Sequence, residues 1–267
     1  SMQNILEYYD ELFPVSSEQK LFYDEILNTF EIEPKILSIN CGTGIFEHYL
    51  SRRNCNVTGI DYIPGLLESA TRRHRQPGCT IRFFQMTILE MAQYLGKGFY
   101  NLISCIHNRL PPIPNASQME QFFRDCRSLL APEGYFILQI PNYPYFTCQQ
   151  VGKLPVSESI RLKLYTKLIT DDNGTRIHQQ VETSSGKLVT VRNYQQVYPL
   201  AAQDVEELAM ETGFREVQFY SDFEKNVFIP EKVDNIEMGI FSNCYNLESI
   251  EVDINNKTFD SRKKVHH

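Results

Sequence analysis

A short turn rich in small residues is the part of this sequence best suited to binding a ligand. Residues 40–44 read Asn-Cys-Gly-Thr-Gly and follow the apolar run 36–39, and helical periodicity begins directly after them. Glycines let a ligand approach the backbone, and the first turn of a helix offers unpaired N–H groups to an anionic group. Asp61 ends a second apolar run and can accept hydrogen bonds from a ribose diol. The pattern therefore predicts a site for an adenosine-containing ligand.

The spacing of the glycines distinguishes two kinds of adenosine ligand. A nicotinamide site favours the pattern GxGxxG, whereas this turn has Asn40 at the first glycine position and no third glycine. The sequence instead resembles the first two motifs of class I S-adenosylmethionine-dependent methyltransferases at residues 36–44 (ILSINCGTG), 57–61 (VTGID), Pro64, Leu66, Leu67 and Ala70. The resemblance implies methyl transfer with S-adenosyl-L-methionine as cofactor and S-adenosyl-L-homocysteine as product.

Other segments resemble the glycine/sarcosine N-methyltransferase-like branch and its small-molecule relatives. These segments are residues 9–14 (YDELFP), 105–110 (CIHNRL), 138–143 (LQIPNY), 213–214 (GF) and 220–223 (YSDF). The resemblance covers about residues 5–224, and the cofactor-binding residues that it implies are Tyr9, Asn40, Cys41, Gly42, Gly44, Asp61, Tyr62, Thr87, Ile88 and Cys105. Gly42 and Gly44 would line the methionine part of the cofactor. Asp61 would hold the ribose hydroxyls, and Tyr9 would close over the ligand.

The same resemblance implies a site for the methyl acceptor. It places the substrate beside Asn108, Asn142 and Tyr143, with His107 and Tyr143 as candidate catalytic residues. Methyl transfer from a sulfonium is an in-line displacement, so the protein mainly aligns and desolvates the reactants. His107 is the candidate proton acceptor because an ordinary histidine titrates near pH 6.5. The alternative interpretation is that His107 only forms part of the pocket wall or bonds to the backbone. An arginine that binds the amino-acid carboxylate in glycine methyltransferases would fall at Pro141, so we expect a small neutral or cationic acceptor, an amine, rather than free glycine.

Three departures from the family pattern leave other functions open. Ser38 stands where the family has an acidic residue, and Asn40 stands at the usual first glycine. Thr87 replaces an acidic residue that contacts adenine. Because these changes remove charge or space beside the ligand, we expect weaker cofactor binding. The alternative function is a non-catalytic or degenerate protein that binds S-adenosylmethionine or S-adenosylhomocysteine, and a nucleotide-dependent oxidoreductase is a further possibility.

Apolar runs alternate with helical periodicity over the first 140 residues. We predict strands at 36–39, 55–60, 80–85, 99–106 and 134–140, with helices at 45–53, 64–74 and 117–130. This order predicts an α/β fold with a Rossmann-like, doubly wound and mostly parallel sheet. An antiparallel β insertion follows strand five at about 160–198, with turns at 171–174 and 184–186. A helix at 202–212 and a strand at 214–220 then resume the α/β pattern.

The last forty residues differ from the rest in composition. Their apolar residues have the spacing of one bacterial surface-type leucine-rich repeat, at Ile229, Val233, Ile236, Phe241, Cys244, Leu247, Ile250 and Val252. We therefore divide the chain into a methyltransferase domain at 1–225 and a leucine-rich-repeat-like segment at 226–267. One repeat cannot bury its own apolar face, and no obvious final strand follows Phe223. We expect the segment to pack against the domain, with residues 247–254 supplying the missing strand at the sheet edge.

Composition restricts the remaining function classes. Apolar residues make up 42% of the chain, charged residues 22%, and the net charge is −7, which disfavours a nucleic-acid partner. The seven cysteines form no CxxC pair and the six histidines no HExxH motif, so we predict no metal site and a reducing, cytoplasmic location. No apolar run approaches the roughly 20 residues of a membrane span. We expect a monomer or homodimer whose partner is a small-molecule methyl acceptor.

Overall fold

Seven strands form the main sheet, in the order β11-β12-β5-β4-β1-β2-β3. The computed structural model describes residues 2–74, 77–78, 80–226 and 240–246. The strands are β1 (Lys35–Ile39), β2 (Asn56–Asp61), β3 (Ile81–Gln85), β4 (Tyr100–Cys105), β5 (Leu130–Pro141), β11 (Glu216–Tyr220) and β12 (Ile240–Asn246). Strands β1 to β5 run parallel, and β12 runs antiparallel to both of its neighbours. The predicted Rossmann-like, mostly parallel sheet is confirmed.

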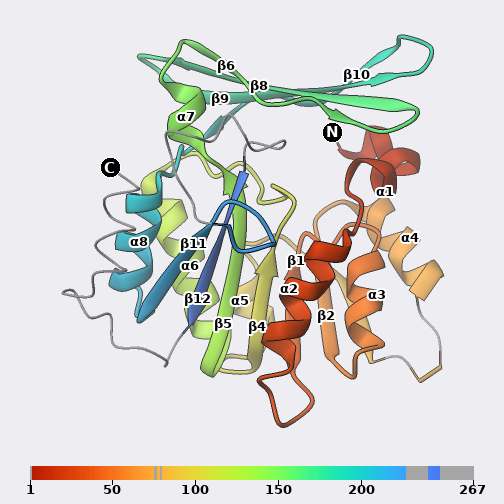
Figure 1. The fold of residues 1–267 in the computed structure, drawn as a ribbon, viewed down its shortest axis with the longest axis vertical. Coiled ribbons are helices and arrows are strands. Elements are labelled where there is room, and N and C mark those ends of the chain that lie inside the picture. The colour runs from red at the N-terminus through yellow and green to blue at the C-terminus, as the bar shows by residue number, and fades with distance from the viewer. Residues whose placement is uncertain (1, 75–76, 79, 227–239, 247–267) are drawn as a thin grey trace.

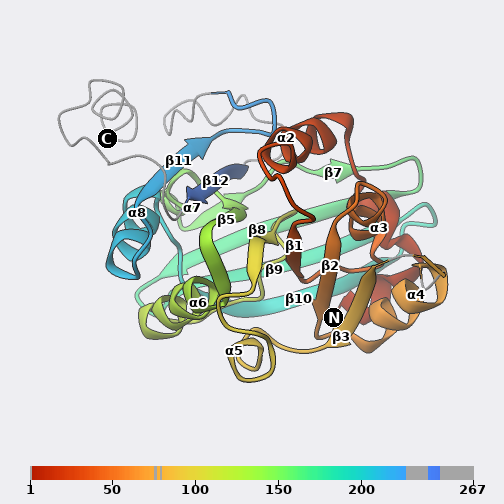
Figure 2. The same ribbon diagram turned by 90° about the horizontal axis from the view of Figure 1, so that it is seen from below.

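Helices cover both faces of this sheet (Figures 1 and 2). The helices of the described residues are η1 (Met2–Tyr8), α1 (Tyr9–Leu12), α2 (Ser17–Leu27), α3 (Ile45–Ser51), α4 (Pro64–His74), α5 (Met91–Tyr94), α6 (Ala116–Leu129), α7 (Tyr143–Thr147) and α8 (Ala202–Glu211), of which η1, α1 and α7 contact the antiparallel sheet described below. Phe22 of α2 and Leu50 of α3 pack on one face. Phe123 of α6 and Val205 of α8 pack on the other face. Within the described part of the chain, no helix is long and apolar enough to cross a membrane.

The alternation of side chains along β1 determines which groups reach the ligand-binding turn. Ile36 packs in the cluster beneath α2 and α3, whereas Leu37 and Ile39 pack in the cluster beneath α6 and α8. Successive side chains of a strand point to opposite faces, so Ser38 lies on the same face as Ile36. This places the polar Ser38 beneath α3, the helix that begins at the end of the turn.

A second, antiparallel sheet lies across the carboxyl ends of the parallel strands like a roof (Figure 1). Its strands are β6 (Val151–Lys153), β7 (Ser157–Glu158), β8 (Leu162–Asp171), β9 (Gly174–Thr183) and β10 (Leu188–Val197). They are ordered β10-β9-β8-β6, and β7 pairs with β8. The insertion and its Asn173-Gly174 hairpin turn are confirmed. Strands β6 and β7 and the short helix α7 were not predicted, because segments of two to five residues carry no readable periodicity.

The final strand of the main sheet lies elsewhere than predicted. We expected residues 247–254 to supply it at the sheet edge, and that range lies outside the described residues. The strand is β12 instead, and it lies between β5 and β11, with Phe241 opposite Ile140 and Cys244 opposite Gln218. Phe223 is therefore followed by a final strand that the sequence analysis did not recognise. Residues 227–239 and 247–267 of the leucine-rich-repeat-like segment lie outside the described residues.

Candidate active site

The turn after β1 adopts a left-handed backbone conformation at three positions. Asn40, Gly42 and Gly44 all have positive φ, at 55°, 62° and 78°. A Cβ atom added to Gly42 would lie 2.2 Å from the ring of Tyr9, so only glycine fits beneath that ring. The side chain of Asn40 donates from Nδ2 to the Arg109 carbonyl at 2.5 Å. Asn40 therefore ties the turn to the loop that follows β4.

Asp61 lies next to this turn and is fully buried. Its carboxylate accepts hydrogen bonds from the backbone N–H groups of Gly42 at 2.9 Å and Ile63 at 3.0 Å. It also forms a salt bridge of 2.9 Å with the guanidinium of Arg109, which is 3% exposed. That guanidinium lies over the ring of Tyr9, 4.9 Å from its centroid. The predicted ribose acceptor is therefore held by an internal cation, a role that we did not predict for Arg109.

A second buried carboxylate lies beneath the turn. Glu47 of α3 is 4% exposed, and its Oε1 accepts a hydrogen bond of 2.5 Å from the Ser38 hydroxyl. Burial raises the pKa of Glu47 to about 7, although the hydrogen bond from Ser38 acts in the opposite direction. The sequence had suggested that negative charge was lost at Ser38. In the structure, Glu47 of the neighbouring helix α3 places a carboxyl group beside Ser38.

Six of the ten predicted cofactor residues line two separate cavities. The turn cavity, of about 420 Å³ with its open mouth included, is lined by residues such as Tyr9, Asn40, Cys41, Glu47 and Arg109. The β3 cavity, of about 680 Å³ measured in the same way, is lined by residues such as Tyr62, Thr87 and Ile88. Asp61 precedes Tyr62 in the chain and pairs with Arg109, so the buried ion pair joins the walls of the two cavities.

Some predicted cofactor residues have other surroundings. Cys105 is fully buried in the core, which raises the pKa of its thiol to about 12. A Cβ atom on Gly44 would meet the Phe83 ring at 2.7 Å, so this glycine is required by packing of the chain itself. The backbone N–H and hydroxyl of Thr87 both donate to Glu90 Oε2, at 2.8 and 2.9 Å. The acidic group that the sequence lacks at Thr87 is thus present three residues later.

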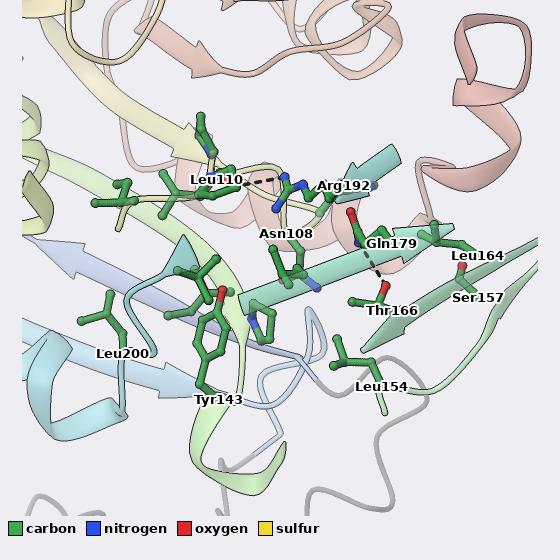
Figure 3. Close-up of a pocket in the computed structure, with 18 of the residues that line it drawn as sticks. Asn108, Leu110, Tyr143, Leu154, Ser157, Leu164, Thr166, Gln179, Arg192 and Leu200 are labelled. Carbon is green, nitrogen blue, oxygen red and sulfur yellow. Dashed lines mark hydrogen bonds between the residues drawn. The ribbon is translucent and has the colours of Figure 1, made fainter. Parts of the chain in front are cut away.

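A larger cavity, which we call the roof cavity, lies between the carboxyl ends of the parallel strands and the antiparallel sheet (Figure 3). It measures about 930 Å³ with its open mouth included, and its walls are mostly apolar. The predicted residues His107, Asn108 and Tyr143 line it, whereas Asn142 is buried at the start of α7 and is not part of its lining. Phe13 and His107 line both this cavity and the turn cavity. The roof cavity and the turn cavity are therefore adjacent.

His107 lies at the junction of the two cavities, with a positive φ of 60°. Its Nε2 is 2.7 Å from Gln19 Oε1, and its backbone N–H donates to Gln139 Oε1 at 2.6 Å. Because Gln19 presents an acceptor oxygen, Nε2 carries the proton in this arrangement and Nδ1 keeps the lone pair. Burial, assisted by the charge of Arg109, lowers the pKa of His107 to about 4. The imidazole is therefore neutral at physiological pH and a weak base.

Two further residues of the roof cavity were missed by the sequence analysis. Arg192 and Gln179 come from β10 and β9 of the antiparallel sheet, and both are more than nine-tenths buried. Burial also raises the pKa of the neighbouring Tyr143 to about 12, so its hydroxyl stays protonated. Nothing in the local sequence marks Arg192, because its position depends on how the antiparallel sheet folds back over the strand ends.

Residues 36–134 match a family model described as a methyltransferase domain. Among curated proteins, the chain is 30% identical over 108 residues to a ubiquinone biosynthesis O-methyltransferase of Pseudomonas aeruginosa, covering 40% of this chain and 44% of that protein. The protein of the same name from Histophilus somni is 30% identical over 115 residues, covering 41% of this chain and 46% of that protein. The chain thus spans less than half the length of these relatives.

Solved structures of methyltransferases share the fold over nearly the whole chain. An S-adenosylmethionine-dependent methyltransferase from Clostridium acetobutylicum superposes with a TM-score of 0.70 at 18% identity, covering 93% of this chain and 99% of that chain. The CcbJ methyltransferase from Streptomyces caelestis gives 0.68 at 18% identity, covering 92% and 96%. The S-adenosylmethionine-bound amino pentose methyltransferase CalS10 from Micromonospora echinaspora gives 0.61 at 15% identity, covering 91% and 97%. The protein therefore has the α/β Rossmann-like methyltransferase fold.

Proposed function

We propose that the protein is an S-adenosylmethionine-dependent methyltransferase that acts on a small molecule. The observation that carries this proposal is the glycine turn at 40–44, with Asp61 at the end of the adjacent strand and the roof cavity beside it. The match of residues 36–134 to a methyltransferase domain supports the same activity. The bound cofactor would supply an electrophilic methyl group on a sulfonium, and the protein would align the acceptor with it.

The residues around the turn fit such a cofactor. We place the methionine part in the turn cavity, where the Glu47 carboxyl would face its ammonium group in place of the acidic residue that the family has at Ser38. Asp61 would accept from the ribose, and three donors already use three of the four lone-pair sites of its carboxylate. Tyr62 and Thr87 would flank the adenine in the β3 cavity. The glycine/sarcosine-like branch stays a prediction.

Cofactor binding by this site requires a rearrangement. The Arg109 guanidinium and the Tyr9 ring lie over the turn and over Asp61, where the ribose would bind. We propose that the ligand displaces Arg109 from Asp61 and that Tyr9 then packs against the ligand. The hydroxyls of a ribose can replace the hydrogen bond that the guanidinium donates to the carboxylate, but the exchange leaves Arg109 without its partner and therefore reduces the free energy of cofactor binding.

The acceptor we propose is an amine. Tyr143 and Phe13 supply aromatic surface to the roof cavity, and the fold is shared by an enzyme named as an amino pentose methyltransferase. The neutral imidazole of His107 would accept a hydrogen bond from the N–H group and would not compete with the sulfonium for charge. The relatives named as O-methyltransferases make a hydroxyl acceptor the competing outcome of an assay.

A non-catalytic binding protein is the second candidate function. The matches to a methyltransferase domain and to proteins named as methyltransferases do not favour it. A protein of this kind would bind S-adenosylhomocysteine and transfer no methyl group to any acceptor. A measurement of turnover therefore distinguishes the two functions, whereas a measurement of cofactor binding does not.

Calorimetry with S-adenosylhomocysteine tests the cofactor site. Asp61→Asn keeps the size of the side chain and removes its charge, so we expect binding to weaken by about tenfold to a hundredfold, as for the loss of a charged hydrogen bond. Asp172→Asn, in the exposed hairpin turn, is the matched control and should bind as the wild type does. Absence of binding to the wild type, or preference for a nicotinamide cofactor, would contradict the proposal. Transfer of a labelled methyl group to a panel of amines and alcohols then separates the enzyme from the binding protein.

A further inference from the structure

The roof cavity contains a buried arginine without an acidic partner. Arg192 is 7% exposed and lines the cavity (Figure 3). In the described part of the chain, its guanidinium donates a single long hydrogen bond, 3.4 Å from Nη2 to the Leu110 carbonyl. Within the described residues, no carboxylate lies within salt-bridge distance of its guanidinium, and no Asp or Glu lines the cavity. Arg192 therefore gives this cavity a positive charge that the surrounding protein does not neutralise.

A local irregularity of β10 aims Arg192 inward. Its pairing with β9 shifts register between Thr190 and Arg192 and again between Arg192 and Gln195. Val191 and Arg192 are consecutive and both buried, whereas a strand covered on one face only buries alternate residues. Val191 packs against the N-terminal helices, while Arg192 enters the cavity. Bulges commonly redirect a side chain beside a functional site.

Burial of the Arg192 charge destabilises the fold, and the nearby positive charge of Arg109 adds to this effect. Burial lowers the pKa of Arg192, and the charge of Arg109 lowers it further, while the Tyr62 and Tyr143 hydroxyls act in the opposite direction. A buried charge without a partner destabilises a fold unless another group neutralises it. Arg109 lies in the same region and has Asp61 as its partner. Arg192 has no such carboxylate partner in the described residues. We therefore expect a ligand to supply the anionic group.

The rest of the cavity wall indicates the other parts of that ligand. Most of the lining is aliphatic or aromatic, with Leu110, Ile113 and Leu164 among its members. Two buried amide oxygens, Asn108 Oδ1 and Gln179 Oε1, have no hydrogen-bond partner within the described residues. They would accept hydrogen bonds from an N–H or O–H group. The wall thus combines one cation, two acceptors and a wide apolar surface.

We propose that the roof cavity binds a small carboxylic acid with an apolar body, and that Arg192 binds its carboxylate through the two arms of the guanidinium. The proposal deepens the proposed function by assigning the acceptor's anionic group, and it revises the expectation of a neutral or cationic acceptor. Pro141 does lack a guanidinium, as the sequence indicated, but the roof sheet supplies one from β10 instead. The N–H or O–H group of the same molecule, held by the amide oxygens, is then the methyl acceptor.

Benzoate is a minimal probe for this site, because it combines a carboxylate with a small apolar body. We expect millimolar benzoate to bind the full chain in ligand-observed NMR, and benzamide, its neutral counterpart, to bind at least tenfold more weakly. Arg192→Gln should abolish the difference between the two probes, and Arg192→Lys should retain part of it. Arg176→Gln is the matched control, because Arg176 pairs with Asp171 on the same sheet and does not line the cavity.

Stability measurements separate a binding arginine from a structural one. If Arg192 serves a ligand, Arg192→Gln should fold and should unfold at the same urea concentration as the wild type or at a higher one, since it removes an unpaired buried charge. A large loss of stability would assign Arg192 a structural role and overturn the proposal. Equal binding of benzoate and benzamide by the wild type, or binding of inorganic phosphate in preference to benzoate, would also overturn it. None of these results depends on S-adenosylmethionine, so failure here is distinct from failure of the proposed methyl transfer.

Discussion

Replacing Glu47 by glutamine should remove a specific pH dependence of folding. Burial raises the pKa of this carboxyl from its ordinary 4.5 to about 7. Between these two pH values the folded protein keeps a proton that the unfolded chain has released, so unfolding releases a proton. The contribution of Glu47 to the free energy of unfolding is therefore fully present below pH 4.5. It decreases as the pH rises and is lost above pH 7.

The size of this effect follows from the two pKa values. The difference between 4.5 and about 7 corresponds to about 3 kcal/mol, because one pKa unit is worth about 1.4 kcal/mol. About 2 kcal/mol of this falls between pH 5.5 and pH 8, a range in which the fold is easily studied. Glutamine is neutral throughout this range and still offers an oxygen to the Ser38 hydroxyl. From pH 5.5 to pH 8, the wild type should therefore lose about 2 kcal/mol of stability relative to Glu47→Gln.

Urea denaturation at several pH values between 5.5 and 8 measures this difference. The comparison of two variants at each pH is essential, because the lowered pKa of His107 gives a slope of opposite sign below pH 6.5 and is present in both proteins. Glu207→Gln, which changes an exposed carboxyl on α8, is the control and should follow the wild type. If wild type and Glu47→Gln keep a constant difference in stability across the range, Glu47 is ionised in the folded protein and the reasoning from burial is refuted.

Four further perturbations have expected outcomes. Arg109→Met should destabilise the fold by about 3–5 kcal/mol in urea denaturation because it leaves Asp61 buried and unpaired, and Asp61→Asn in the same chain should restore most of the loss. Gly42→Ala should abolish detectable S-adenosylhomocysteine binding in calorimetry, because a Cβ there meets the Tyr9 ring at a φ of 62°; normal binding would contradict the assigned turn. The kcat of the wild type should show no inflection near pH 6.5 from His107, whose pKa is lowered to about 4, and His107→Asn should lower kcat without changing the shape of the profile. Truncation after residue 226 removes β12 from between β5 and β11 and should give an insoluble or strongly destabilised chain, whereas an unchanged melting temperature would contradict the sheet order.

Local rules in the sequence predicted the elements that carry the turn. The alternation of apolar runs and helices gave the parallel sheet, and Asn173-Gly174 identified a hairpin of the roof. Gly42 and Asp61 were correctly brought together, since their hydrogen bond follows from the order of strands β1 and β2. These features depend on residues close in sequence or on one crossover between adjacent strands. Such features can be recognised without knowing how distant segments pack.

Several of the missed features depend on contacts between different elements of the fold. The salt bridge between Asp61 and Arg109 joins the ends of β2 and β4, and no motif in the sequence between them predicts it. Glu47 of the neighbouring helix supplies the carboxyl group that is missing at Ser38. A comparison of motifs position by position therefore indicates that the acidic group is lost, although the folded protein keeps one. The register of β12 was missed for the related reason that its strand inserts between two others.

The two buried arginines suggest how charge is distributed in this site. Arg109 is neutralised by Asp61, so that pair contributes little net charge to the turn and is available for exchange with a ligand. Arg192 has no carboxylate partner in the described residues, so its charge is directed at the contents of the roof cavity. His107, between the two cavities, stays neutral because burial lowers its pKa and the charge of Arg109 lowers it further. An anionic acceptor would neutralise Arg192, and the ammonium of the cofactor would face Glu47. Cofactor binding would separate Arg109 from Asp61 and leave the positive charge of Arg109 uncompensated near that of Arg192. An anionic acceptor should therefore bind more tightly when the cofactor is present than when it is absent.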